Sequence, residues 1–339
     1  MIMNTRIKIF TVIVLLFSAS MALAQNHEKF VGRWALTIPG GGAGWLGIED
    51  NDGYLDGSIL WGGGSVVPLD SVCVDGDNLV LTRLRRVERK DADGKVIRTQ
   101  TYTETITATI SQDKMELTQI VPQQNGKGTR REKFTGKRIA PLPPKPDISK
   151  AKRGKPVKLF NGKNLDGWKL LGRENGWSAE NGLLINNPVQ PKGKHIYYGN
   201  LCTVDEFEDF NLKLELNVDK GGNSGVYLRG IYEVQVAETY GKGRDSHFLG
   251  AVYSRITPSV SAEKPAGQWQ TLDITLLERH ITVILNGITI IDNQPLLGCT
   301  GGALWSDEFR PGPIYLQGDH TAVKYRNIVL TPLTAEKKK

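Results

Sequence analysis

Three short segments in the C-terminal half of the chain carry polar side chains suited to acid–base chemistry. They are GVYLRG (225–230), YEVQV (232–236) and IYLQGDH (314–320). Alternate side chains of a β-strand point to the same face, and the aliphatic residues of each segment mark its core face. The opposite faces then predict one shared polar surface that contains Tyr227, Arg229, Glu233, Gln235 and Gln317.

Glu233 and His320 are the candidates for general acid, general base or metal ligand, since carboxyl and imidazole groups serve all three roles. Arg229 is a candidate for stabilising a negatively charged oxygen, and a hydrated divalent metal ion would do so more strongly. No spacing in the sequence identifies such a metal. The structural alternatives are an exposed Arg229–Glu233 ion pair and a strand-end role for His320. The candidate substrate-binding residues are Asn223, Tyr227, Gln235 and Gln317.

The remaining histidines and the tryptophans of this half are expected to be structural. His195 precedes IYYGN, His247 lies in the polar loop GKGRDSHFLG, and His280 begins a regular strand. None of the three is expected to be a ligand. Most tryptophans are expected in the core, although some are candidates for stacking on a sugar ring; the four are Trp168, Trp177, Trp269 and Trp305.

Regular alternation predicts that residues 156–333 form an antiparallel all-β domain. FNLKLELNV (210–218) alternates without a fault, and HITVILNGITIID (280–292) contains Asn286-Gly287, a strong signal for a two-residue hairpin turn. Ten to twelve such strands most naturally form two packed sheets, a jelly-roll sandwich. One concave face of such a sandwich is the usual place for a sugar.

Residues 27–140 predict a second, smaller all-β domain. Turn signals separate short segments rich in β-branched residues, and about eight strands in a meander indicate a closed or half-closed antiparallel barrel. Gly32-Arg33-Trp34 is similar to the Gly-x-Trp of lipocalin-like barrels, and Arg138 could cover that tryptophan. The glycine-rich stretches 38–45 and 61–65 precede no helix, so they predict tight turns or close backbone approaches rather than phosphate loops. Whether this domain binds a ligand or docks on its neighbour stays open.

Two segments outside these domains carry most of the excess positive charge. Residues 1–24 combine Arg6, Lys8, an apolar run and Ala22-Leu23-Ala24, which predicts a secretory signal peptide cleaved after Ala24. Residues 141–155 hold four prolines and five basic residues, which favour an extended linker. The formal net charge of +7 therefore describes the leader, the linker and the basic tail 334–339. Neither folded body is expected to bind nucleic acid, and no segment besides the leader is a candidate membrane span.

The chain contains three cysteines, Cys73, Cys202 and Cys299. Export would permit a disulfide, and Cys202 with Cys299 is the candidate pair because both lie in the same half. No Cys/His spacing reads as a zinc site.

Many motifs of residues 156–333 resemble, in order, the 3-keto-disaccharide hydrolase family. The resemblance implies a concanavalin-like jelly roll, export, and a carbohydrate substrate oxidised at carbon 3 by a separate sugar dehydrogenase. It implies cleavage of 3-keto-glycosides, in some members by elimination of the aglycone and hydration of the resulting 2-hydroxy-glucal. It does not extend to residues 27–140. The motifs that carry it are KLFNGKNLDGW (158–168), WSAENGLL (177–184), GGNSGVYLRG (221–230), YEVQV (232–236), GAVY (250–253), KPAGQWQTLDI (264–274), LNG (285–287) and GPIYLQGDHTAVKYRNI (312–328).

The implied reaction has simple chemical requirements. A ketone at carbon 3 acidifies the hydrogen on carbon 2, and the group on carbon 1 can then leave. The site needs a base near carbon 2, a donor for the carbon-3 oxygen and an acid for the departing oxygen. It does not need the two spaced carboxylates of ordinary glycosidases.

Two alternatives stand beside this interpretation. EVQVAE (233–238) is similar to the E-x-D-x-x-E signature of laminarinase-type β-glucanases, but Gln235 replaces the middle aspartate and cannot supply a carboxylate. The other alternative is a carbohydrate-binding module without activity, because folds of this kind often only bind.

Overall fold

The structure is a computed structural model that describes residues 27–193 and 195–336. The predicted signal peptide lies outside the described residues, as do the last three residues of the basic tail. The chain divides into two compact units, one with residues up to 60 and 67–139, the other with 61–66 and 140–339. Among the described residues, no helix is long and apolar enough to cross a membrane.

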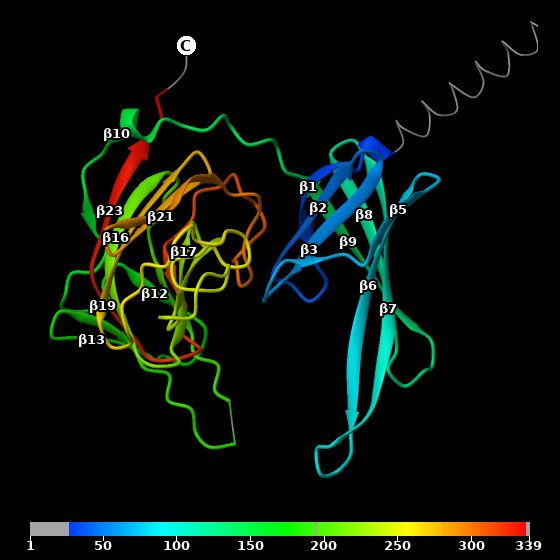
Figure 1. Ribbon diagram of the computed structural model, residues 1–339, viewed down its shortest axis with the longest axis horizontal. Coiled ribbons are helices and arrows are strands. Elements are labelled where there is room, and N and C mark those ends of the chain that lie inside the picture. Colours follow the sequence, from blue (N-terminus) through cyan, green and yellow to red (C-terminus); the bar gives the residue numbers. More distant parts are fainter. Residues whose placement is uncertain (1–26, 194, 337–339) are drawn as a thin grey trace, which may run out of the picture. The chain divides into compact units, whose positions relative to one another are not determined.

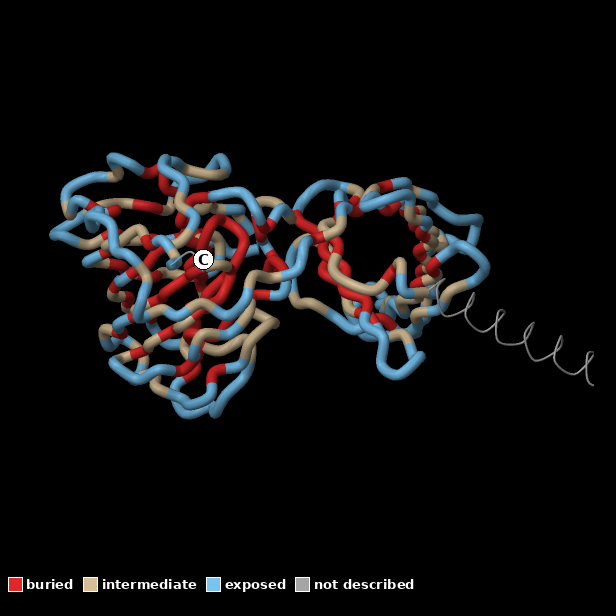
Figure 2. The backbone as a smooth tube through the Cα atoms, turned by 90° about the horizontal axis from the view of Figure 1, so that it is seen from above, coloured by how far each residue is buried: buried red, intermediate tan, exposed pale blue. Residues whose placement is uncertain are grey.

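The first unit is an antiparallel β-barrel of nine strands in the order β4-β3-β2-β1-β9-β8-β7-β6-β5 (Figure 1). Leu69 N donates to Gly57 O of β3, and Asp70 N donates to Thr82 O of β6, so the β4–β5 segment closes the barrel. Figure 2 shows these strands as a ring. The strands are β1 (Gly32–Thr37), β2 (Ala43–Asn51), β3 (Tyr54–Trp61), β4 (Val67–Pro68), β5 (Ser71–Asp75), β6 (Asn78–Lys90), β7 (Val96–Ser111), β8 (Lys114–Pro122) and β9 (Thr129–Arg138).

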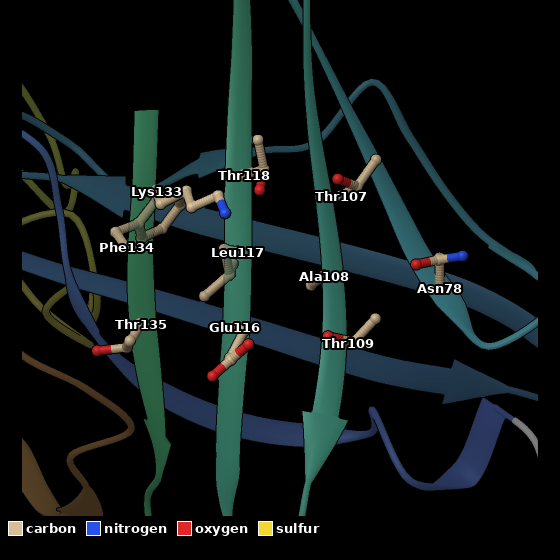
Figure 3. Close-up of a pocket in the computed structure, with 10 residues that line it drawn as sticks. All are labelled: Asn78, Thr107, Ala108, Thr109, Glu116, Leu117, Thr118, Lys133, Phe134 and Thr135. Carbon is tan, nitrogen blue, oxygen red and sulfur yellow. The ribbon is translucent and has the colours of Figure 1, made fainter. Parts of the chain in front are cut away.

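Trp34 on β1 is fully buried, and the Arg138 guanidinium lies 4.1 Å from its ring centroid. The predicted cover of this tryptophan by Arg138 is therefore confirmed. A shallow pocket of about 530 Å³ lies on β6 to β9 (Figure 3). Its polar groups are mainly threonine hydroxyls, with Glu116 and Lys133, and it contains none of the predicted site residues.

The second unit is a sandwich of two antiparallel sheets, as predicted. The larger sheet has the order β13-β14-β23-β16-β19-β20-β21, with β10 and β11 also paired to β23, and the smaller has the order β12-β15-β22-β17-β18. The strands are β10 (Lys152–Arg153), β11 (Val157–Lys158), β12 (Trp168–Leu171), β13 (Trp177–Glu180), β14 (Leu183–Asn186), β15 (Asn200–Thr203), β16 (Phe210–Val218), β17 (Asn223–Leu228), β18 (Tyr232–Ala237), β19 (Trp269–Leu277), β20 (His280–Leu285), β21 (Ile288–Pro295), β22 (Tyr315–Leu316) and β23 (Val323–Thr334).

The segments with the clearest alternation form strands of the larger sheet. In β16 the alternating residues Phe210, Leu212, Leu214, Leu216 and Val218 are all buried. Asn286 and Gly287 have φ of 51° and 82° and join β20 to β21 as predicted. The described chain has more strands here than expected, since β10 and β11 have two residues each and are too short to show alternation.

Part of the predicted linker is ordered against β23. Asp147 caps a single 3-10 turn (Ile148–Lys150) by accepting from Ser149 N, and β10 then pairs with Leu333 and Thr334. This pairing could not be read from proline and lysine content, because main-chain bonds between distant segments leave no mark on composition. The candidate disulfide is not formed: Cys202 and Cys299 are buried free thiols, and Cys73 is an exposed one.

Candidate functional site

A pocket of about 420 Å³ on the smaller sheet contains six of the seven predicted site residues. Strands β17 and β18 pair so that Tyr227 lies opposite Glu233 and Gly225 opposite Gln235, and β22 places Tyr315 beside Tyr227. Residues directly opposite in an antiparallel pair face the same side, so the pairing gathers side chains distant in sequence. The pocket is lined by Gly63, Gly64, Asn223, Tyr227, Glu233, Gln235, Tyr253, Gly301, Gly302, Gln317 and His320.

Glu233 is the buried carboxyl of the pocket, with 3% of its surface exposed. Its Oε2 lies 2.8 Å from the Tyr227 hydroxyl, and burial raises the pKa of Glu233 to about 8. A methyl group on Gly225 would lie 2.2 Å from Glu233 Oε1, so only glycine leaves space for the carboxyl. A carboxyl with a pKa near neutrality is suited to proton transfer.

Two stacked tyrosines form the floor beside Glu233. The rings of Tyr227 and Tyr315 are 3.9 Å apart and nearly parallel. The Tyr227 hydroxyl lies 2.7 Å from Gly301 O, and the Tyr315 hydroxyl donates to Gly302 O at 3.0 Å. Burial raises the pKa of both hydroxyls above the ordinary value. Both tyrosines are therefore neutral groups held in place by main-chain carbonyls.

Three amide side chains supply hydrogen-bond acceptors to the same pocket. Gln235 Nε2 donates to Asn223 Oδ1 at 2.9 Å, which fixes the orientation of the Gln235 amide. Gln235 Oε1 and Gln317 Oε1 are buried and have no hydrogen-bond partner among the described residues. Unpaired buried acceptors are rare because they forfeit the hydrogen bonds that water would provide. Here they are suited to receive hydroxyl donors of a ligand.

Arg229 is the predicted site residue that the structure places elsewhere. It is 1% exposed, and its guanidinium donates to Glu308 O at 2.8 Å and to Arg310 O at 2.6 Å. Strand β17 ends at Leu228, and Arg229 has φ of 54° in the turn to β18, so strand alternation does not extend to it. The prediction that Arg229 shares the polar surface is wrong. The alternative, an exposed Arg229–Glu233 ion pair, is excluded as well, because both side chains are buried and the Arg229 guanidinium bonds main-chain carbonyls.

His320 is exposed and lines the pocket, whereas the other described histidines are not among the lining residues. The His247 ring packs edge-on against Tyr253 of the lining, with 4.8 Å between the ring centroids. His195 pairs with Asp319 at 3.1 Å, His247 pairs with Asp245 at 2.6 Å, and His280 contacts the carbonyl of Glu278. Among residues 27–193 and 195–336 no group of three or more His, Cys, Asp and Glu could hold a metal ion.

Sequence reasoning missed the loop residues of the pocket. Gly301 and Gly302 carry the carbonyls that receive the tyrosine hydroxyls, and Tyr253 lines the pocket from an irregular segment. Loop residues have no periodicity, so strand alternation gave no signal for them, and Tyr253 appeared only within the motif GAVY (250–253). Tyr315 did have one, because it alternates with Gln317.

The second carboxylate of the glucanase-like signature does not join Glu233 in the pocket. Glu238 lies one residue beyond β18, accepts a hydrogen bond from Gly221 N and pairs with Lys242 at 3.5 Å. It is not among the residues that line the pocket.

Several known proteins are similar to this chain in sequence or in structure. A 3-keto-disaccharide hydrolase from Bacteroides thetaiotaomicron is 26% identical over 148 residues, which are 35% of this chain and 51% of that protein, so the chain spans about half the length of this curated relative. A candidate glycosyl hydrolase of known structure from Parabacteroides distasonis is 26% identical, with a TM-score of 0.42 over 57% of this chain and 92% of the other. The carbohydrate-binding module CBM66 from Bacillus subtilis is 11% identical, with a TM-score of 0.33 over 48% of this chain and 93% of the module.

The family match covers residues 155–331, which include both sheets of the sandwich except β10 and the last three residues of β23. This is more than half of the 339 residues. It agrees closely with the region 156–333 that the sequence motifs indicated. The chain belongs to the family of 3-keto-alpha-glucoside-1,2-lyase-like domains.

Proposed function

We propose that this protein cleaves 3-keto-glycosides by removing the proton on carbon 2 and eliminating the aglycone from carbon 1. Hydration of the product then gives net hydrolysis. The family membership and the relative named as a 3-keto-disaccharide hydrolase support the substrate class. The observation that carries the proposal is the pocket itself, where a buried carboxyl, an imidazole and unpaired amide oxygens come together.

The pocket is suited to a neutral, hydroxyl-rich ligand. The buried polar atoms of its described lining that lack a partner are both acceptors, the amide oxygens of Gln235 and Gln317. Sugar hydroxyls supply the matching donors. No lysine or arginine occurs among the described residues that line it, so nothing there compensates a negatively charged ligand.

Glu233 and His320 are the two proton-transfer groups of the pocket. One takes the proton from carbon 2, and the electron pair of that C–H bond becomes the new C1=C2 double bond. The other gives a proton to the aglycone oxygen as the C1–O bond breaks. Water then adds across the double bond, its oxygen to carbon 1 and a proton to carbon 2, with both groups returning to their starting states.

Export and a supplying enzyme belong to the same proposal. A free sugar must be oxidised at carbon 3 before this reaction is possible, so a separate sugar dehydrogenase has to supply the substrate. The leader-like segment 1–24 supports action outside the cytoplasm.

The test is turnover of a 3-keto-glucoside by the purified chain, beside the unmodified glucoside and a β-glucan, with and without chelator. We expect aglycone release from the 3-keto-glucoside alone, and a loss of about 100-fold or more in kcat for Glu233→Gln. Glu238→Gln is the matched control, since Glu238 lies outside the pocket lining, and should keep full activity. Binding of the 3-keto-glucoside without turnover would favour the carbohydrate-binding module, and turnover of plain β-glucan would favour the laminarinase-type reaction.

A further inference from the structure

Proton counting around Tyr227 determines which way its hydrogen bonds run. The Tyr227 oxygen lies 2.7 Å from Gly301 O and 2.8 Å from Glu233 Oε2. A tyrosine hydroxyl carries one proton, a carbonyl oxygen can only accept, and an ionised carboxylate can only accept. If Glu233 is ionised, two acceptors compete for one proton. One short oxygen–oxygen contact is then left without a hydrogen, which is repulsive in a buried site.

The neighbouring tyrosine cannot supply the missing proton. Tyr315 donates its only hydroxyl hydrogen to Gly302 O, and its ring stacks on Tyr227. The two consecutive carbonyls, Gly301 O and Gly302 O, thus take one hydrogen from each tyrosine. A proton on Glu233 completes the set, because Glu233 then donates to Tyr227 and Tyr227 donates to Gly301 O.

Among the described residues, no lysine or arginine lines the pocket around Glu233 to favour the ionised form. The titratable groups that face it are Tyr227 on β17, Tyr315 on β22 and Tyr325 on β23, with Tyr253 and His320 in the pocket lining. Its main-chain N–H donates to Thr300 Oγ1, so that amide is not available to the carboxyl. Burial in an uncharged environment disfavours a carboxylate.

We propose that Glu233 is a neutral carboxylic acid in the resting protein, the proton donor to the departing oxygen, and that Tyr227 is its positioning residue. The assignment of Glu233 as the acid of the elimination rests on the proposed function. It leaves His320 as the base that accepts the proton from carbon 2. In the elimination Glu233 becomes a carboxylate and His320 an imidazolium. In the hydration Glu233 takes a proton from water and His320 returns its proton to carbon 2.

Infrared difference spectroscopy of the full, ligand-free chain tests the protonation state directly. The carbonyl stretch of a neutral carboxylic acid should appear at pH 7 in the wild type and be missing in Glu233→Gln. It should disappear on titration with a midpoint well above that of an ordinary glutamate. A wild-type spectrum without this band at pH 7 would overturn the proposal.

The sign of the shift in Tyr227→Phe tests the positioning role. If Tyr227 accepts a hydrogen bond from neutral Glu233, removal of the Tyr227 hydroxyl destabilises the neutral form of Glu233. The midpoint of the Glu233 titration should then fall by about one pH unit. If Tyr227 instead donates to a carboxylate, the midpoint should rise; a rise or no change would overturn the positioning role. Tyr315→Phe is the matched control, because it loses the same bond to a glycine carbonyl but none to Glu233, and should leave the midpoint in place.

The spectroscopic and kinetic experiments test the protonation state and the proposed function separately. A neutral Glu233 in a chain that does not cleave 3-keto-glucosides would refute the proposed function and leave the protonation state standing. An ionised Glu233 in a chain that does cleave them would refute the inference alone.

Discussion

The residue at the centre of the pocket has an environment that favours function over stability. Glu233 is almost fully buried, hydrogen-bonded through its side chain to Tyr227, and next to two amide oxygens that have no partner among the described residues. Burial of the carboxyl and the two unpaired amide oxygens each cost folding free energy that a leucine or a paired glutamine would not. Such local conflicts are expected where a fold holds groups ready for a ligand. They identify the pocket as a site more strongly than its volume does.

Glu233→Gln is therefore expected to make the protein more stable at high pH while it removes activity. The pKa of Glu233 is raised from an ordinary 4.5 to about 8 in the fold. Between these values the folded state holds a proton that the unfolded state has released, so stability falls as pH rises, by up to about 1.4 kcal/mol per pH unit. Glutamine does not titrate, so its variant escapes this loss.

Thermal unfolding of both proteins from pH 5 to pH 9 measures this effect. The melting temperature of Glu233→Gln minus that of the wild type should increase across the range and level off above pH 8. Glu238→Gln, the control outside the pocket lining, should have the same pH dependence of melting temperature as the wild type. A difference that stays constant with pH would contradict a raised pKa.

At the scale of elements, the pocket depends on how β17 and β18 pair. Their register places Tyr227 opposite Glu233, and Gly225 lies on the same face two residues away. A glycine inside a strand often marks a close approach of another group. Here that group is Glu233 Oε1.

Gly225→Ala should consequently reduce activity much more than stability. The added methyl would meet the carboxyl at 2.2 Å and move Glu233 from Tyr227. Val226→Ala is the matched control: Val226 is fully buried, so its truncation should cost about 1–2 kcal/mol of stability and leave the pocket intact. Chemical denaturation and kcat for both variants separate the two effects. Equal activity losses in the two would argue against a steric role for Gly225.

Sequence patterns predicted those elements whose faces differ in polarity over several residues. The β16 alternation and the Asn286-Gly287 turn were correct because each is a local consequence of side-chain type. Arg229 was misplaced because alternation stops where a strand ends, and at this end both Arg229 and Gly230 have left-handed backbone conformations. The pairing of β10 with β23, and the contacts of the Gly301 and Gly302 carbonyls with the tyrosine hydroxyls, join segments that are distant in the sequence. Those contacts have no residue signature.

At the scale of the whole chain, the family match and the candidate site residues both lie in the second unit. The family match begins at residue 155, so the barrel formed by residues 27–60 and 67–139 lies outside it. The site residues belong to the second unit, in which residues 61–66 are grouped with 140–339. The excess of positive charge predicted for the linker region lies partly on β10, at its pairing with β23, rather than near the pocket. A substrate without charge is consistent with this separation.

The three cysteines give a prediction for the molecule as a whole. Export would expose them to an oxidising compartment, yet the fold holds Cys202 and Cys299 apart as buried thiols. Burial raises the pKa of Cys202 to about 11 and that of Cys299 to about 12, so neither forms the reactive thiolate at neutral pH. Cys73 is exposed on β5.

Thiol titration should therefore detect one fast-reacting group in the native chain and three after unfolding in denaturant without reductant. Cys73→Ser should abolish the fast reaction and leave two thiols in the unfolded chain, whereas Cys202→Ser should keep the fast reaction. A single thiol in the unfolded wild type would mean that Cys202 and Cys299 are joined in solution. That bond would require the two buried strand and loop segments to move together, and it would then change the packing under Tyr227 and Tyr315, which contact Cys202 in the same core cluster. The titration thus reports on the support of the pocket as well as on the redox state of the chain.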